Sequence, residues 1–526
     1  MNKLKKGIVA GLLVSAVALT AVFSGQFKNA KADNIKGTSG TEYERNTNLS
    51  VDSNGALRVK RNDIGNEPMG EKGTWTVFVY MCGSDLETNY NAASTDIKEM
   101  ISASESDKVN IIIQTGGANG WNKPAIAADR IGRYIIKNNR LEEIETYPDA
   151  NMGDGATLKS FLSWGIKRYP AEKMGVILWN HGGGTIGGVC CDEKNDYDAL
   201  SLTEMEKALS DVSKKMTDKF EFVGFDACLM ASLETANMLV PYADYMIASE
   251  QVESGDGWYY KPFVNALVKN PSIDGKEVGK VIVDAFMQVV EEVGEEYEFS
   301  TLSVTDLSKV DDVIVAFNEV AKQMDEKCVS DKEINIFLEE ATNSLQEGCG
   351  DVEYFMVDLY SYMDKISSVV SNTDKVKAAI KNMVVYEKHG KVASNANGIT
   401  FYFPTMSCGM SYMNMLRNVI TSPYYMNFID KIECYNMFLY KDMVKQGYLD
   451  EDYKPVEDKD TSEYVASEYK LENYKDNNWE SSKYYFDTDY EFMEYDFNTF
   501  EEYEELRDFP YYQEATFDDN WYELYD

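Results

Sequence analysis

Imidazole and thiol chemistry have few candidate positions in this chain, because its 526 residues include only two histidines and eight cysteines. His181 follows the apolar segment Met174–Trp179, and Cys228 follows the apolar segment Phe220–Phe225. A neighbouring imidazole can accept the proton of a thiol, and the thiolate is the nucleophile in cysteine catalysis. The two residues therefore predict a Cys-His dyad for acyl transfer. The alternative is a flexible glycine loop beside a buried, inert cysteine.

The elements that must position this dyad are short apolar strands alternating with helices. Strands are expected at residues 75–81, 109–114, 174–179, 220–225 and 245–249, a hairpin at 134–147, and helices at 91–102, 156–168, 202–216 and 232–239. This alternation predicts an α/β fold with a mostly parallel sheet flanked by helices. Functional groups collect at the carboxyl ends of such strands, which is where both candidate residues stand.

Backbone amides next to the dyad have the right placement for an oxyanion hole. An N–H beside His181 and the N–H of Cys228 can together donate to a tetrahedral intermediate, and Gly182 lets a substrate approach the backbone closely. Residues 260–440 continue the domain or form a second lobe. Helices are expected there at 278–293, 310–324 and 376–386, with a strand at 398–403.

The remaining candidates for thiol or imidazole chemistry have simpler interpretations. Cys82 ends the first predicted strand and is expected in the core. Cys190 and Cys191 are adjacent, a spacing that seldom forms a disulfide, although Cys191 stays a rival nucleophile. His389 precedes a glycine but follows a predicted helix, so a surface turn is expected there.

Charge and motif content exclude several functions. With 51 Lys and Arg against 89 Asp and Glu, the net charge is −38, which disfavours nucleic acid as a partner. The chain has no HExxH, CxxC or EF-hand pattern, so no metal ligands are assigned. The dyad chemistry requires no cofactor. Calcium is plausible for so acidic a chain, but its site is unknown.

Both ends of the chain differ in composition from the middle. Residues 1–32 combine early lysines, an uncharged run and a small-residue cleavage pattern ending at Ala32, which predicts a signal peptide and a secreted, extracellular protein. An uncleaved membrane anchor is the alternative, and no membrane span is expected after signal removal. Residues 33–72 are polar and predict a linker or pro-segment outside the core. Between 450 and 526 lie 26 acidic and 6 basic residues with many aromatic ones.

Three segments of the sequence are similar to a known family. The blocks WTVFVYMCGSDLE at 75–87, ILWNHGGG at 177–184 and GFDACLMASLE at 224–234 resemble the clostripain family of cysteine endopeptidases. The second and third blocks hold His181 and Cys228, 47 residues apart and each after an apolar strand. The resemblance implies the caspase-like fold shared with gingipains, legumains and separases.

The resemblance also implies roles for individual residues. It makes His181 the general base or acid, Cys228 the nucleophile, and the amides of Gly182 and Cys228 the oxyanion donors. Asp226, two positions before the nucleophile, would line the pocket for the residue preceding the scissile bond and favour Arg or Lys. A helix N-cap is the alternative for Asp226. Two acids after the next strand are further pocket candidates, namely Glu250 and Asp256.

Activation by self-cleavage between the histidine and cysteine segments is a further implication of the resemblance. Lys194 is the expected site, because it lies in a polar segment that reads as a flexible loop near the dyad, whereas Lys207, Lys214, Lys215 and Lys219 lie on or near a predicted helix.

The sequence thus predicts four parts: signal peptide 1–32, linker or pro-segment 33–72, clostripain-like peptidase domain 73–440 with its core at 73–260, and acidic tail 441–526. The leading hypothesis is a secreted cysteine endopeptidase that acts on proteins or peptides with basic residues. The alternative is a catalytically silent, exported binding protein. The tail is expected to associate with the cell surface, to inhibit or to bind a partner, or else to be a solvated extension.

Overall fold

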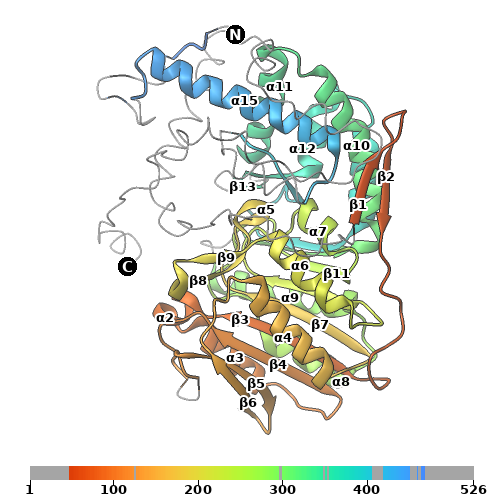
Figure 1. Ribbon diagram of the computed structural model, residues 1–526, viewed down its shortest axis with the longest axis vertical. Helices are drawn as coiled ribbons and strands as arrows, with labels where there is room; N and C mark the ends of the chain where they lie inside the picture. The colour runs from red at the N-terminus through yellow and green to blue at the C-terminus, as the bar shows by residue number, and fades with distance from the viewer. Residues whose placement is uncertain are drawn as a thin grey trace, which may run out of the picture.

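A nine-stranded sheet forms the centre of the computed structural model (Figure 1). The structure describes residues 47–123, 126–294, 299–346, 350–351, 355–405, 419–450, 456, 459 and 464–467. The expected signal peptide, residues 33–46 of the linker and most of the acidic tail lie outside these residues. Within the described part, no helix is both long and apolar enough to cross a membrane.

The central five strands of this sheet are parallel, and two antiparallel strands extend it on each side. The strand order is β15-β12-β11-β10-β7-β3-β4-β5-β6. The parallel strands are β11 (Ala243–Ala248), β10 (Phe220–Asp226), β7 (Lys173–Trp179), β3 (Trp75–Cys82) and β4 (Val109–Gly116). The antiparallel strands are β5 (Arg130–Lys137), β6 (Arg140–Pro148), β12 (Thr301–Asp306) and β15 (Val384–His389). The predicted parallel core of the α/β fold is confirmed.

Strand β3 shows why these apolar runs became central strands. All eight of its residues are buried, as expected for a parallel strand covered on both faces. Val77 and Val79 belong to one hydrophobic cluster, whereas Phe78 and Tyr80 belong to the other. Because side chains alternate along a strand, a continuous apolar run supplies both layers of core.

Helices cover both faces of the sheet. The first face carries α4 (Gly155–Arg168), α6 (Leu202–Ser213) and α7 (Leu233–Leu239). The other carries α3 (Ala92–Ile101), α8 (Tyr260–Lys269) and α9 (Gly275–Val293). Each helix coincides with a sequence prediction except α8, so periodicity located most of these covering elements.

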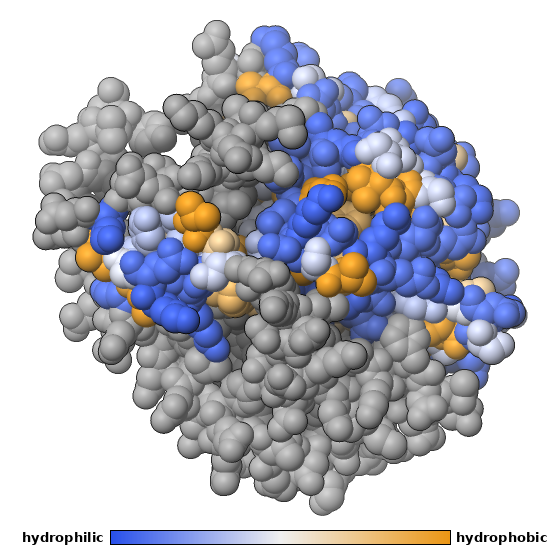
Figure 2. Space-filling model, turned by 90° about the horizontal axis from the view of Figure 1, so that it is seen from above, coloured by the Kyte–Doolittle hydropathy of each residue, from blue (hydrophilic) through white to orange (hydrophobic). Residues whose placement is uncertain are grey.

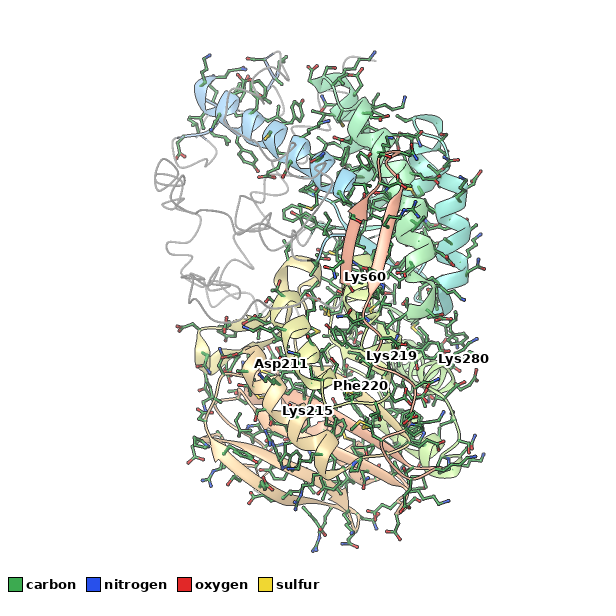
Figure 3. The ribbon with its side chains drawn as sticks, turned by 45° about the vertical axis from the view of Figure 1, so that its right-hand side comes forward. Lys60, Asp211, Lys215, Lys219, Phe220 and Lys280 are labelled. Carbon is green, nitrogen blue, oxygen red and sulfur yellow. The ribbon has the colours of Figure 1, made fainter. Side chains whose placement is uncertain are left out.

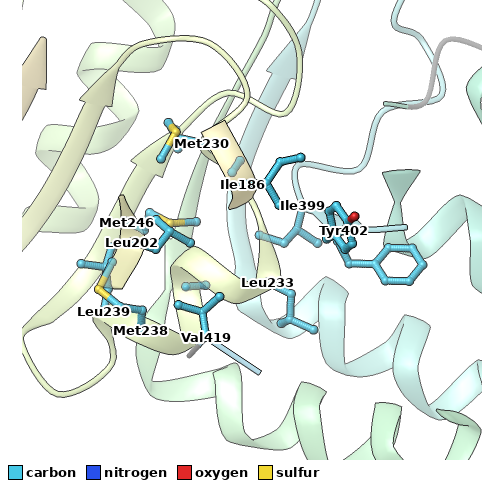
Figure 4. Packing of buried hydrophobic residues seen from close by; sticks show 14 of the residues in the cluster. Ile186, Leu202, Met230, Leu233, Met238, Leu239, Met246, Ile399, Tyr402 and Val419 are labelled. Atoms are coloured by element: carbon cyan, nitrogen blue, oxygen red, sulfur yellow. The ribbon is translucent and has the colours of Figure 1, made fainter. Parts of the chain in front are cut away.

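The carboxyl-terminal half of the chain adds a helical lobe that shares the core of the sheet. Its helices are α10 (Val310–Lys327), α11 (Asp331–Gln346), α12 (Leu359–Lys365), α13 (Thr373–Met383) and α15 (Pro423–Lys445). A small sheet of β13 (Gly350–Asp351), β14 (Met356–Asp358) and β16 (Thr400–Tyr402) joins them. Figure 4 shows Leu233 of α7 beside Ile399 and Tyr402, all members of one buried cluster. The lobe is therefore continuous with the peptidase core.

The segment around His389 differs from the prediction. Helix α13 ends at Met383 and the chain continues as strand β15, in which His389 pairs with Thr301 of β12. The predicted helix at 376–386 has the right length but lies three residues too far along the chain, and the predicted surface turn at His389 is wrong. Val384 and Val385 are β-branched, and pairing with the edge of the sheet satisfies their backbone. His389 Nδ1 lies 2.6 Å from Glu387 Oε1.

A hairpin occupies part of the expected linker. Strands β1 (Thr47–Val51) and β2 (Leu57–Arg61) pair and lie beside α10 (Figure 1), and Leu57 is buried. Figure 3 shows Lys60 on this hairpin. The expectation that residues 33–72 lie wholly outside the core is therefore wrong for 47–61, because alternating apolar residues in this polar segment face the lobe. A pro-segment role stays a prediction.

Arg61 links the hairpin by hydrogen bonds to α7 and to α10. Its guanidinium donates to the carbonyl and the side-chain oxygen of Asn237 at 3.0 and 2.7 Å, to Asp311 Oδ1 at 2.6 Å and to Thr47 Oγ1 at 2.8 Å. The side chain is only 12% exposed, so these charge-assisted bonds are partly shielded from water.

We predict that Arg61→Ala lowers the free energy of unfolding by about 2 kcal/mol, since charge-assisted hydrogen bonds contribute more than neutral ones. Urea denaturation measures the change. The matched control is Arg58→Ala, which removes an ion pair to Asp52 from a side chain that is 71% exposed and is expected to cost under about 0.5 kcal/mol. Equal effects of the two substitutions would contradict the role assigned to Arg61.

Candidate active site

Strands β7 and β10 bring the predicted dyad segments together. The two strands are parallel neighbours in which Trp179 lies opposite Asp226, and the amide of Asn180 continues the pairing by donating to the carbonyl of Asp226 at 3.3 Å. His181 and Cys228 each follow two residues after this matched pair. They therefore leave the sheet at the same edge and the same level.

Gly182 keeps the two segments in direct contact. A Cβ atom at this position would lie 2.1 Å from the carbonyl oxygen of Cys228, which no side chain can tolerate. Among the described residues, neither the amide of Gly182 nor that of Cys228 has an acceptor on another residue. Both predicted oxyanion donors are thus available at the point where the segments meet.

Asp85 orients the imidazole of His181. The distance between His181 Nε2 and Asp85 Oδ1 is 3.0 Å, and Asp85 lies in the first turn of α2 (Ser84–Tyr90), directly after β3. Burial alone would raise the pKa of Asp85, but the hydrogen bond and charge of His181 outweigh it and the pKa is lowered. The carboxylate is therefore ionised at neutral pH. Because it contacts Nε2, the other ring nitrogen, Nδ1, is free to contact a different group.

Asp85 is a functional residue that was not predicted from the sequence, although the order of the strands contains a signal for it. Strand β3 neighbours β7, and Asp85 follows the end of β3 by three residues, in the same way that His181 follows β7. A polar residue after each of three adjacent parallel strands points to one site at that edge.

Cys228 lies in a loop that is fixed by the end of β11. The amide of Leu229 donates to the carbonyl of Gln251 at 3.0 Å, and Ala231 donates to Ser249 at 2.8 Å. Leu229 has a φ of +66°, a left-handed conformation that sharpens the turn after the thiol. Burial, followed by the charge of Glu253, raises the pKa of Cys228 to about 12. The thiol is therefore protonated at neutral pH and needs a base.

Asp226 is buried behind the thiol. Its Oδ1 accepts from the amide of Trp258 at 3.1 Å and its Oδ2 from the hydroxyl of Tyr260 at 2.8 Å, and burial raises its pKa to about 7. The alternative reading of Asp226 as a helix N-cap is wrong, because Ser232 caps α7. The carboxylate therefore faces the interior between β10 and α8.

The other two predicted pocket residues do not join Asp226. Glu250 is fully buried and faces Asp358 of β14. Burial first, and then the charge of Asp358, raises its pKa well above the ordinary value. Asp256 is exposed in the loop before α8, where its charge contributes to a raised pKa of Glu99. A different acid from this loop, Glu253, lies against Cys228, and its amide donates to Sγ at 3.2 Å.

Lys194 does not lie in a flexible loop. It belongs to a 3₁₀ helix (Glu193–Asn195) between β8 (Val189–Asp192) and β9 (Asp198–Leu200), and its Nζ lies 2.5 Å from Asp149 Oδ2. Its side chain is only 17% exposed. The predicted flexible loop is wrong because the polar residues of this segment bind one another instead of solvent. Asp192, for example, accepts from the Lys194 amide at 2.9 Å.

Three cysteines near His181 belong to the core. Cys82, Cys190 and Cys191 are buried, and burial raises the pKa of each thiol. The interpretation of Cys82 as a core residue is confirmed, and full burial argues against Cys191 as a nucleophile. Among the described residues, no group of three or more His, Cys, Asp or Glu side chains has an arrangement that holds a metal ion.

Comparison with known proteins identifies the family. The family model described as "Clostripain family" matches residues 79–521, which is most of the chain. The chain belongs to the clostripain family. It is therefore a cysteine peptidase, which agrees with the resemblance found in the sequence blocks around His181 and Cys228.

Individual relatives of this clostripain-family peptidase are distant. The chain is 24% identical over 465 residues to clostripain of Hathewaya histolytica, and the match covers 74% of this chain and 84% of that protein. A solved structure of a secreted C11 cysteine protease from Bacteroides thetaiotaomicron, bound to an irreversible peptide inhibitor, matches with a TM-score of 0.50 and 19% identity. That match covers 68% of this chain and 99% of the neighbour, and it shows the same fold.

We predict that Asp85→Asn lowers kcat on peptide substrates about 100-fold with little change in KM, because the amide neither fixes the imidazole in the same way nor stabilises its protonated form. Steady-state kinetics provides the measurement. Asp129→Asn, which alters an exposed carboxylate that pairs with Arg130, serves as the control. A loss of thermal stability that fully accounts for the loss of activity would contradict a positioning role.

Proposed function

We propose that this peptidase cleaves peptide bonds after Arg or Lys, with Cys228 as nucleophile and His181 as general base and acid. The observation that carries the proposal is the matched register of β7 and β10, which sets the imidazole segment and the thiol segment side by side. Membership of a cysteine peptidase family supports the same assignment.

The proposed chemistry proceeds in two stages. His181 accepts the proton of the Cys228 thiol as Sγ attacks the carbonyl carbon of the scissile bond, and the resulting oxyanion accepts hydrogen bonds from the amides of Gly182 and Cys228. The imidazolium then protonates the leaving amine and a thioester remains on Sγ. Water, deprotonated by the imidazole, attacks the thioester and releases the acid. Asp85 holds the ring in place throughout, and no metal or cofactor takes part.

Asp226 supports the preference for a basic side chain. It is a buried carboxylate on the strand that leads to Cys228, and no Lys or Arg among the described residues forms an ion pair with it. A substrate cation that reaches this carboxylate gains a charge-assisted contact, which a neutral side chain cannot provide.

Export and the remaining properties stay part of the proposal. We infer secretion from the signal-like residues 1–32, and the Bacteroides thetaiotaomicron neighbour is itself described as secreted. Surface association through the acidic tail and calcium binding at an unassigned site are also part of the proposal, and both rest on composition alone. On the face seen in Figure 2, hydrophilic side chains predominate and hydrophobic ones form small separate groups.

We predict that the wild-type peptidase hydrolyses chromogenic peptides ending in Arg or Lys at least about tenfold faster than peptides ending in norleucine, judged by kcat/KM. Cys228→Ala and His181→Ala should each abolish turnover while leaving the thermal unfolding transition within a few degrees of wild type. Equal turnover of basic and neutral peptides would contradict the substrate class. Turnover that persists in Cys228→Ala would contradict the nucleophile.

Self-cleavage after Lys194 is also part of the proposal. The hairpin of β8 and β9 holds the His181 segment, because the amide of Cys190 donates to the carbonyl of His181 at 3.1 Å. A cut after Lys194 separates these two strands and loosens that contact. The ion pair with Asp149 opposes cleavage, since the Lys194 side chain must leave it to enter an active site. Alternative basic residues such as Lys215 and Lys219 flank the turn between α6 and β10 (Figure 3).

We predict that wild-type protein converts to two associated chains with a new amino terminus at Asn195, whereas Cys228→Ala remains one chain. Asp149→Asn should speed the conversion, because it frees the Lys194 side chain. Intact mass and amino-terminal sequencing follow the reaction. A cut at Lys207 or Lys219 would contradict Lys194 as the cleavage site. Full activity of an uncut enzyme would show that cleavage does not activate the peptidase.

A further inference from the structure

Glu253 is a half-buried residue that contacts Cys228 through its backbone and carries a buried carboxylate. Its backbone amide donates to Sγ at 3.2 Å, and both of its carboxylate oxygens are buried without a hydrogen-bond partner among the described residues. The indole N–H of Trp258 is also buried without a hydrogen-bond partner among the described residues. Burying a carboxylate without hydrogen-bond donors costs free energy. A ligand that donates to Glu253 would offset this cost.

The surroundings of Glu253 are acidic on several sides. Burial, followed by the charge of Asp226, raises the pKa of Glu253 well above its ordinary value. Asp96 and Glu99 of α3 are further acids in this region. Burial first, and then the charges of Asp226, Asp96 and Glu99, raise the pKa of Tyr260. Asp351 of β13 adds its charge at the thiol. Among the described residues, neither Glu253 nor Asp226 has a Lys or Arg partner in an ion pair.

The charge of Glu253 acts directly on the thiol. After burial, it is the largest influence that raises the pKa of Cys228. A thiolate next to an uncompensated carboxylate is electrostatically unfavourable, so Glu253 and Cys228 cannot readily ionise together. A cation placed between Asp226 and Glu253 would remove this repulsion.

We propose that Glu253 couples the recognition of a basic substrate side chain to the reactivity of Cys228, with the substrate supplying the cation that the buried carboxylate lacks. This inference rests on the proposed function. Pairing with Glu253 and Asp226 would neutralise their charge beside the thiol and favour the thiolate. A basic side chain then strengthens binding and also accelerates the chemical step, so that kcat is higher for basic than for neutral peptides.

The test measures alkylation of Cys228 by iodoacetamide at one fixed alkaline pH, above the raised pKa of Glu253, so that this acid is ionised in the free enzyme. Mass spectrometry identifies the labelled residue. The probe is n-butylguanidine, a cation too short to reach beyond the side-chain pocket, and n-butylurea is its neutral counterpart. We expect the guanidine to accelerate labelling of wild-type Cys228 about tenfold, the change that one pKa unit of the thiol produces, and the urea to have no effect. Slower or unchanged labelling with the guanidine would overturn the proposal.

Variants of Glu253 sharpen the result. In Glu253→Gln, labelling of the free enzyme should be faster than in wild type, and the guanidine should no longer accelerate it. Glu253→Asp, which keeps the charge, should retain part of the acceleration. The same acceleration in Glu253→Gln as in wild type would overturn the coupling. Glu291→Gln, an exposed position on α9, is the matched control, and thermal unfolding shows whether each variant is folded.

Peptide kinetics separate this inference from the proposed function. In Glu253→Gln the ratio of kcat for Arg peptides to kcat for norleucine peptides should fall about tenfold or more, while Asp226 still contributes to binding. A wild-type enzyme that prefers basic peptides, combined with an unchanged kcat ratio in Glu253→Gln, would overturn only the role of Glu253. A wild-type enzyme without that preference would overturn the proposed substrate class itself.

Discussion

The pairing of β7 with β10 is the constraint on which the rest of this site depends. Because Trp179 and Asp226 lie opposite each other, the residues two positions further along emerge together. A slip of one residue would turn each side chain to the other face of the sheet and separate the imidazole from the thiol. Gly182 adds a second requirement to this register, because its backbone lies so close to the carbonyl of Cys228 that no side chain fits between them.

The helical lobe takes part in holding this register. Thr185, just after the glycine loop, donates to Ser232 at 3.0 Å, and the buried carboxylate of Glu234 accepts from Thr185 and from the amide of Tyr402. The amide of Thr400 donates to the carbonyl of Ala231 at 2.9 Å. The segment after the histidine, the helix after the cysteine and strand β16 therefore form one bonded unit. The carboxyl-terminal half therefore helps to hold the segments that follow His181 and Cys228 in place.

Local pattern was sufficient for the parallel strands and for the placement of His181 and Cys228, because continuous apolar runs mark strands that are buried on both faces. It was insufficient wherever the deciding contact comes from elsewhere in the chain. The role of Asp85 depends on its contact with a histidine 96 residues away, and the role proposed for Glu253 depends on the burial of its carboxylate. Lys194 looked mobile because its polar neighbours suggested solvent, whereas they bind one another.

The hairpin at residues 47–61 has a consequence for how the chain comes together. Arg61 bonds to Asn237 and to Asp311, which lie 176 and 250 residues further along the chain. These contacts close very long loops, and their entropy must be offset before the hairpin docks. Strands β1 and β2 must therefore wait, during synthesis, until α10 has emerged, so this hairpin is among the last of the described elements to reach its place.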